Sequence, residues 1–357
     1  MALACRAPRL PVLVACFNAG ENGVTLLHNG INRCNRREGS AYFNADDTLN
    51  STTVPREKMS IIDKIAVRIN KKLFNRIARG VVSTPPVKID KSSGLAVLSQ
   101  TYDADIYLYL VAAKTFAKYI RPEIFIIVDD DLSASNKELI VQHLGNVRFL
   151  PRKLVPNTHC PSGGTWERIL SIADVSKDYY VVQLDSDTVT VSNPEVVSEA
   201  LAKYASFTLS THMGRHFISA EQARSEALTF KSGHVQGLAE RALHTVPELS
   251  DKQYIRGCSG FAGFARGSLS REAVEHFSRL MEAQLGQECW ARWGTEQFTS
   301  NYFIANAVNA QPLPFEQYPY WAPGMDLSQA QLIHFIGEDR FTSPKYARVA
   351  AEAIQNL

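Results

Sequence analysis

The sequence lacks paired cysteines, long apolar runs and a large net charge, and each absence excludes a class of protein. Its 6 cysteines form no Cys-x-x-Cys pair and no zinc-ligand spacing, so we expect isolated, reduced thiols and a cytoplasmic protein. No apolar run reaches the ~18 residues that a membrane-spanning helix needs. The formal net charge of +2 provides no basic field, so we expect no nucleic-acid partner. The cysteines are Cys5, Cys16, Cys34, Cys160, Cys258 and Cys289.

The chain is long enough for more than one folded unit, yet its first part has no pattern. With 357 residues, 45% of them hydrophobic, it can form one large or two ordinary domains. Residues 1–55 show no sustained period and are rich in Asn, Arg and Gly, so we predict a poorly ordered segment there. The apolar run at 10–17 is too short and interrupted for a signal peptide, and Met59 is an alternative start of the native protein.

A basic amphipathic helix is predicted over residues 57–80. Apolar residues recur there at helical spacing, with lysine and arginine around them. Such a helix can make a peripheral contact with the inner face of a membrane, or it can pack on the following domain with its basic face in water. The sequence leaves both interpretations open. The periodic apolar residues are Ile62, Ile65, Ile69, Leu73 and Ile77.

From about residue 94 onward, short apolar runs alternate with helical patterns. This alternation indicates an α/β fold with a mainly parallel sheet and helices on both faces. After residue 187 we expect a smaller mixed region. Strands are predicted at 95–100, 123–128, 146–150, 179–184, 207–210, 254–266 and 331–337. Helices are predicted at 105–119, 133–144, 164–173, 193–204, 219–245, 271–285 and 295–307.

Polar residues follow three of these strands, at 99–101, 129–131 and 185–187. Ligands of parallel sheets bind beyond the carboxyl ends of the strands, so these residues should share one rim. Asp185 and Asp187 are two residues apart, and residues at that spacing point to the same side of a strand. Two carboxylates suit Mg²⁺ or Mn²⁺, ions that usually also bind substrate phosphates. The segment therefore predicts a metal site for a phosphate-bearing substrate.

Other interpretations of the aspartates stay open. Aspartates after strands are also common in turns and at helix N-caps. Phosphatases of the haloacid-dehalogenase type place Asp-x-Asp-x-Thr/Val after an apolar strand and use the first Asp as phosphoryl nucleophile, a role that Asp185 fits. The lysine and acidic pair that such an enzyme also needs are offered by Lys252, Glu338 and Asp339.

The segment His334-Phe-Ile-Gly337-Glu-Asp-Arg340-Phe341, taken with Asp185 and Asp187, resembles family 8 of the glycosyltransferases, which includes glycogenin-like and lipopolysaccharide-galactosyltransferase-like enzymes. These end in His-Phe-x-Gly-x-x-Lys-Pro-Trp. The resemblance implies a GT-A-like fold over residues 94–345, with His334 as third metal ligand and Arg340 contacting the diphosphate. The sequence departs from the family with Arg340 for Lys and Phe341 for Pro, which places it at the edge of the family or in a sister family.

Further segments resemble the same family in the same order. Residues 125–133 are similar to its second strand and acidic turn, and residues 166–170 to the helix whose basic residue, here Arg168, reaches the donor. Residues 296–301 resemble Asp-Gln-Asp-x-x-Asn, which implies that Glu296 and Gln297 contact the transferred sugar. Phe298 does not match the second Asp, and residues 205–250 match nothing in the family.

The resemblance implies transfer of a sugar from a nucleotide-diphosphate sugar, a UDP-sugar above all, to an acceptor hydroxyl with retention of configuration. The acceptor would be a glycan or a lipid-linked molecule, and the cofactor Mn²⁺ or Mg²⁺. A base role for Glu296 would instead indicate inversion, and a non-catalytic nucleotide-sugar-binding module is a further alternative. Residues assigned to base and ribose, each with an ordinary polar turn as the alternative, are Ser99, Gln100, Asp103 and Asp129.

Three weaker candidates complete the sequence predictions. Gly260 lies in a glycine-rich strand that would let the backbone approach the sugar, or that would form a β-bulge. His212 and His216 have the i, i+4 spacing of a helical metal pair, but a surface or acceptor-loop position fits them better. Trp290 and Trp293 would stack on an acceptor sugar or lie in the core.

Overall fold

The computed structural model describes residues 60–230 and 233–357. These residues belong to one compact unit. The predictions for residues 1–55 and for Met59 lie outside the described residues. Among the helices that the structure describes, none is long and apolar enough to cross a bilayer.

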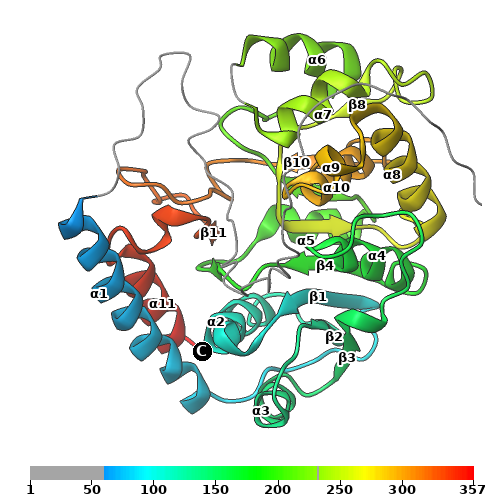
Figure 1. The fold of residues 1–357 in the computed structure, drawn as a ribbon. Coiled ribbons are helices and arrows are strands. Elements are labelled where there is room, and N and C mark those ends of the chain that lie inside the picture. The colour runs from blue at the N-terminus through cyan, green and yellow to red at the C-terminus, as the bar shows by residue number, and fades with distance from the viewer. Residues whose placement is uncertain (1–59, 231–232) are drawn as a thin grey trace, which may run out of the picture. The chain divides into compact units, whose positions relative to one another are not determined.

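The central sheet has seven strands in the order β10-β6-β9-β4-β1-β2-β3 (Figure 1). Strands β1 to β4 run parallel, whereas β9 is antiparallel to both β4 and β6. The prediction of an α/β fold with a mainly parallel sheet is confirmed. The strands are β1 (Leu95–Thr101), β2 (Ile124–Asp129), β3 (Val147–Pro151), β4 (Tyr180–Leu184), β6 (Phe207–Leu209), β9 (Cys258–Phe264) and β10 (Gln311–Leu313).

The inner strands of the sheet are buried on both faces, so they are largely apolar runs, whereas the edge strand β3 is partly exposed. Along β1, Leu95 and Val97 enter one hydrophobic core while Ala96 and Leu98 enter the other, because neighbouring residues of a strand point to opposite faces. One core also holds α1 (Ile61–Ala78), α2 (Ile106–Ala117), α3 (Ala134–Leu144), α5 (Glu195–Ala202) and α11 (Lys345–Gln355). The other holds α4 (Trp166–Val175), α6 (Ala220–Thr229), α7 (Val235–Leu243), α8 (Arg271–Leu285), α9 (Gln287–Trp290) and α10 (Thr295–Ala305).

One predicted helix is in fact two. The pattern over 219–245 forms α6 and α7, because Phe230 after α6 is extended, with φ −85° and ψ 133°. A new N-cap starts α7, where the His234 side chain accepts a hydrogen bond from the Gln236 amide.

The order of the strands reverses at β1. The chain builds β1, β2 and β3 outward in one direction, then returns to place β4 on the other side of β1. Ligands of open α/β sheets bind at such a reversal, outside the carboxyl ends of the strands. The ends of β1 and β4 are close there, since Ser186 Oγ lies 3.5 Å from Thr101 Oγ1.

After β4 the chain leaves the large sheet. Strand β5 (Thr188–Thr190) pairs antiparallel with β11 (Leu332–His334), with His334 opposite Thr188. A second small ribbon joins β7 (Ile218–Ser219) to β8 (Gln253–Tyr254). The β5–β11 pairing therefore brings a segment near the end of the chain to the carboxyl edge of β4.

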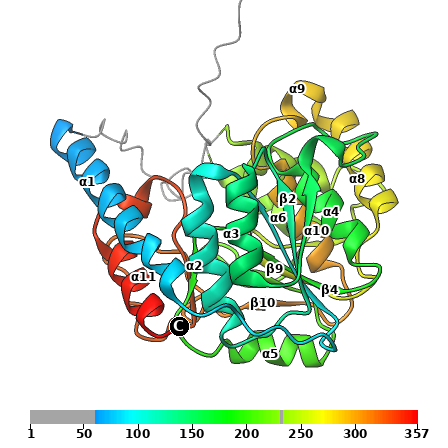
Figure 2. The same cartoon turned by 90° about the horizontal axis from the view of Figure 1, so that it is seen from below.

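Helix α1 lies along α11 in both views (Figures 1 and 2). It is held there by Phe74 and Ala78, which are fully buried, and the Phe74 ring centroid lies 3.9 Å from that of Tyr346 in α11. Asn70 Nδ2 donates a hydrogen bond of 2.9 Å to the Phe341 carbonyl. The periodic residues Ile62, Ile65, Ile69 and Leu73 are not on this face, and all four are exposed.

Candidate metal and donor site

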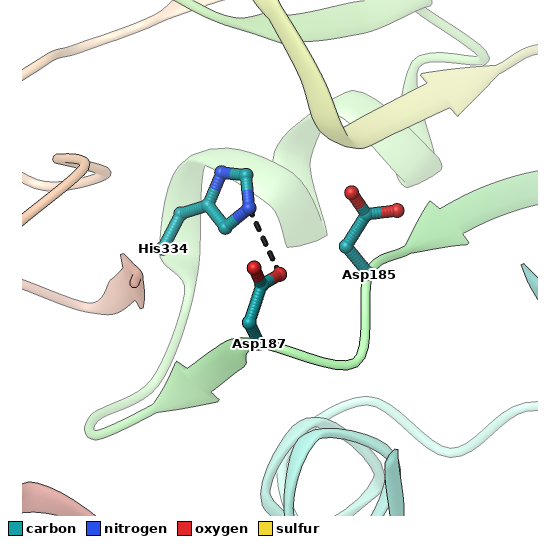
Figure 3. Close-up of side chains that lie close together, drawn as sticks. All are labelled: Asp185, Asp187 and His334. Atoms are coloured by element: carbon teal, nitrogen blue, oxygen red, sulfur yellow. Dashed lines mark hydrogen bonds and ion pairs between the residues drawn. The ribbon is translucent and has the colours of Figure 1, made fainter. Parts of the chain in front are cut away.

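Asp185, Asp187 and His334 come together beyond the carboxyl end of β4 (Figure 3). Asp185 directly follows β4, Asp187 directly precedes β5, and His334 is the last residue of β11. One ligand atom from each side chain lies within 4.8 Å of those of the other two. The three residues that the sequence predicts as metal ligands are thus neighbours, although His334 is 147 positions beyond Asp187.

Asp187 is held from two sides. His334 Nε2 lies 3.0 Å from its Oδ1, and the Arg340 guanidinium pairs with its Oδ2. Burial alone would raise the pKa of Asp187, but Arg340 and His334 outweigh it and hold the pKa at about 2. Burial would likewise lower the pKa of His334, yet the contact with Asp187 raises it well above its usual value. Asp187 is therefore an ionised carboxylate that two neighbours hold in position.

Asp185 is the more accessible carboxylate. Its side chain is 27% exposed, against 9% for Asp187. Its backbone amide donates to the Gly260 carbonyl at 2.8 Å, and its Oδ1 accepts from Arg168. Burial raises the pKa of Asp185 to about 6, with Arg168 opposing and Asp187 adding to the rise. The open side of the site is therefore beside Asp185.

Gly260 supports the imidazole of His334. A Cβ at position 260 would lie 2.0 Å from Cε1 and 2.7 Å from Nε2 of that ring, so only glycine leaves room for it. The other ring nitrogen, Nδ1, lies 3.5 Å from Cys258 Sγ. The predicted purpose of the glycine, an approach of backbone to sugar, stays a prediction. The structure shows that Gly260 in β9 leaves space for the imidazole ring of His334.

Arg168 links Asp185 to α10. From the buried face of α4 it pairs with Asp185 and, at 3.0 Å, with Glu296 Oε2, which also accepts from Thr165 at 3.0 Å. Gln297 Oε1 accepts from the Ser259 amide at 3.2 Å. Among the described residues, Glu296 Oε1 and Gln297 Nε2 are buried without a hydrogen-bond partner. Buried polar atoms are normally paired, so these two atoms are exceptions in the fold.

The four residues predicted to hold base and ribose differ in availability. Ser99 is fully buried and donates to the Leu184 carbonyl at 2.6 Å, and Asp129 pairs with Lys137 at 2.6 Å. Asp103 Oδ1 accepts hydrogen bonds from the side-chain amide of Asn136 at 2.7 Å and from the backbone amide of Ser133 at 2.8 Å, at the start of α3. Gln100 is the exception, because its buried Oε1 has no partner among the described residues.

Sequence reasoning missed several neighbours of the site. Asp105, at the start of α2, interacts electrostatically with Arg340 and Asp187; burial raises its pKa and Arg340 opposes the rise. Cys258 and Ser259, which contact His334 and Arg168, stand beside the predicted Gly260, but no local pattern marks them. Thr165, which donates to Glu296, adopts φ 80°, an unusual value for a residue with a side chain.

The weaker candidates lie elsewhere. His212 and His216 sit in a non-helical segment between β6 and β7, so they do not form the helical metal pair, and His212 bonds the Tyr320 hydroxyl. Trp290 is buried and donates to Ser278 at 2.9 Å, whereas Trp293 is 40% exposed. Lys252 pairs with Asp251 at 3.2 Å and is 41% exposed.

The chemistry of the site fits a divalent cation. Two carboxylates with one imidazole is a donor set suited to Mn²⁺, and carboxylates alone suit Mg²⁺. The ligand atoms of the three side chains lie within 4.8 Å of one another, a cluster of the size that could hold one ion. Cys258 beside Nδ1 and Gly260 against the ring fix the orientation of the imidazole, as outer contacts of metal-binding histidines do.

No protein-family model matches this sequence, and no curated protein matches it at a significant level. Among solved structures, the chain is similar to mouse xyloside xylosyltransferase 1 in its apo form, with 14% identity, a TM-score of 0.42, and coverage of 69% of this chain and 98% of that one. It is also similar to the galactosyltransferase LgtC with donor and acceptor sugar analogs, with 11% identity, a TM-score of 0.38, and coverage of 71% and 95%. Similarity at this level does not decide what the chain does.

Proposed function

We propose that the chain is a glycosyltransferase that uses a divalent cation, Mn²⁺ or Mg²⁺, to move a sugar from a nucleotide-diphosphate sugar to an acceptor hydroxyl. The observation that carries this proposal is the meeting of Asp185, Asp187 and His334 at the carboxyl edge of a parallel sheet. The order of motifs that resembles glycosyltransferase family 8 supports it. The cation, when bound, would neutralise the diphosphate as it leaves.

Two arginines support the departure of a diphosphate. Arg168 pairs with Asp185 and Arg340 with Asp187, and both guanidinium groups are buried and held in place. Charge that is already oriented stabilises a developing negative charge without reorganisation. Arginine can also bind phosphate oxygens through two parallel hydrogen bonds. In this proposal Arg340 takes the place that lysine has in the resembling family.

Glu296 and Gln297 would hold the transferred sugar. Both lie at the start of α10, and each keeps one buried polar atom without a partner, Glu296 Oε1 an acceptor and Gln297 Nε2 a donor. A pyranose ring presents hydroxyls that can satisfy both. Gln100 Oε1, similarly unpartnered at the end of β1, is the best candidate to contact the base or ribose of a UDP-sugar.

We propose that the configuration at the transferred carbon is retained. The family resemblance implies retention, and the contacts of Glu296 support it. Its Oε2 is held by Arg168 and Thr165, which fixes the side chain and leaves only the buried Oε1 for a contact with the sugar. The acceptor would be a glycan or a lipid-linked hydroxyl.

The phosphatase alternative requires a lysine beside Asp185. Lys252 pairs with Asp251 on the surface instead, and the cation that contacts Asp185 is Arg168. A phosphatase also has no use for His334 on Asp187. The geometry therefore favours the transferase.

A screen of donor hydrolysis tests the proposal. The protein is incubated with a set of nucleotide sugars, with Mn²⁺, with Mg²⁺ or with a chelator, and release of nucleoside diphosphate is measured. We expect release from one or a few donors that requires the cation and is lost in Asp187→Ala. Hydrolysis of simple phosphomonoesters, with a phosphoryl group trapped on Asp185, would refute the proposal and support the phosphatase.

A further inference from the structure

The outward face of α1 is apolar and basic together. Five of the exposed large apolar side chains of the described residues lie on this one helix, with Ile65 50% and Ile69 59% exposed. Five exposed cations lie among and beside them. We call these ten residues the α1 face: Ile61, Ile62, Ile65, Ile69, Leu73, Lys64, Arg68, Lys71, Lys72 and Arg76.

The α1 face is available without unfolding. The helix packs on the domain through the opposite side, with Phe74 and Ala78 buried and Asn70 bonded to the Phe341 carbonyl. Its one acidic residue, Asp63, is engaged in a capping box with Ser60. Nothing on the helix therefore neutralises the cations of the α1 face.

We propose that the α1 face docks on an anionic lipid surface. A stripe of isoleucine beside lysine and arginine matches the boundary between acyl chains and acidic headgroups, where amphipathic basic helices lie in the plane of the membrane. Charge selects this occupant over the alternatives. A second copy would bring the same cations together, and their repulsion disfavours it. Residues 1–59, with seven Lys or Arg and five Asp or Glu, also carry a net positive charge and are disfavoured for the same reason.

The docking helix touches the site. The Phe341 carbonyl that accepts from Asn70 belongs to the residue after Arg340, and Phe341 packs its ring against Phe74, with centroids 5.8 Å apart. A membrane bound to the α1 face would thus be separated only by this helix from the segment that places Arg340 on Asp187. Resting on the proposed function, this arrangement favours an acceptor that is itself lipid-linked.

Co-sedimentation of the full chain with vesicles tests the docking, with no sugar donor present. Vesicles of phosphatidylcholine alone are compared with vesicles that also contain phosphatidylglycerol, at low and high salt. One variant, Ile65→Ser with Ile69→Ser, removes apolar contacts; its matched control is Leu154→Ser with Val308→Ser, side chains that are 74% and 81% exposed elsewhere. A second variant, Lys64→Gln with Lys72→Gln, is matched by Lys88→Gln with Lys91→Gln, both exposed.

We expect wild type to bind only the anionic vesicles, and less at high salt. The isoleucine variant should lose about 100-fold in affinity, and the lysine variant about 30-fold, since each cation near an anionic surface contributes about fivefold. Both controls should bind as wild type does. All substituted positions are exposed, so circular dichroism should report unchanged folding.

Absence of binding to anionic vesicles would overturn the proposal, as would unchanged binding of the isoleucine variant. Light scattering on wild type and on that variant would then show whether a second copy covers the α1 face. The vesicle assay contains no sugar donor, so a failure to bind vesicles would not count against metal-dependent nucleotide release. Conversely, a failure to release nucleotide would not count against vesicle binding.

Discussion

Substitution of Gly260 by alanine should damage the metal site while sparing the fold. The added Cβ would lie 2.0 Å from His334 Cε1, whereas ordinary contact begins at 3.4 Å, so the ring must retreat by about 1.4 Å. Its backbone cannot follow freely, because His334 N donates to the Pro319 carbonyl at 2.9 Å and its carbonyl accepts from Trp321 at 2.8 Å. The strain should therefore fall on the bond between His334 Nε2 and Asp187.

The expected loss follows from these distances. Metal ligands tolerate displacements of only about 0.2 Å, and a misplacement of about 1 Å at a reacting group can cost about 10²-fold. We expect Gly260→Ala to bind Mn²⁺ at least about 100-fold more weakly than wild type. Overpacking should lower the free energy of unfolding by about 1–3 kcal/mol.

Calorimetric titration with Mn²⁺ and urea denaturation measure the two quantities. Gly237→Ala is the matched control, because Gly237 lies in α7 and a Cβ there meets nothing within 4 Å. That control should keep wild-type affinity and gain about 0.5–1 kcal/mol in stability. Unchanged Mn²⁺ affinity in Gly260→Ala would refute the reasoning that the glycine positions the histidine.

Three further outcomes are expected. Asp187→Asn should lower the free energy of unfolding by about 3–5 kcal/mol in the absence of metal, because the buried His334 and Arg340 lose their counter-charge. Urea denaturation measures this loss, and unchanged stability would contradict the prediction. Glu296→Gln should keep turnover within about tenfold of wild type, whereas a loss of about 10²–10⁴ with intact donor binding would identify a general base and inversion. Burial lowers the pKa of Lys114 to about 8, so the folded chain binds fewer protons than the unfolded chain between pH 8 and the usual 10.5. The contribution of Lys114 to stability should therefore rise by about 3 kcal/mol over that range. Denaturation of wild type and of Lys114→Met at several pH values measures it as the pH-dependent difference between the two, and a constant difference would contradict it.

The sequence predicts the parallel strands well because each is a short apolar run that ends in polar residues. Burial on both faces makes β1, β2 and β4 largely apolar, and aspartates mark the ends of β2 and β4. The pair Asp185 and Asp187 could be identified for the same reason. His334 was named through a family resemblance, since an isolated histidine in an apolar strand carries no signal of its partner.

Contacts between distant segments could not be predicted. No local pattern states that β5 pairs with β11, or that the His334 ring rests on Gly260. The periodicity of residues 57–80 identified a helix but not its packed side. Both sides of α1 carry apolar residues, and only the position of α11 determines that Phe74 is buried and Ile69 exposed. Helix α11 was not predicted, although Tyr346 and Ala350 have helical spacing.

The central claim is that Asp185, Asp187 and His334 bind one divalent cation together. Pulsed electron paramagnetic resonance of the protein titrated with Mn²⁺ tests it most directly. We predict one tightly bound Mn²⁺ per chain whose spin echo is modulated by a single imidazole nitrogen, with the modulation lost in His334→Gln. Failure to bind Mn²⁺, or a bound ion whose echo shows no imidazole nitrogen, would contradict the account.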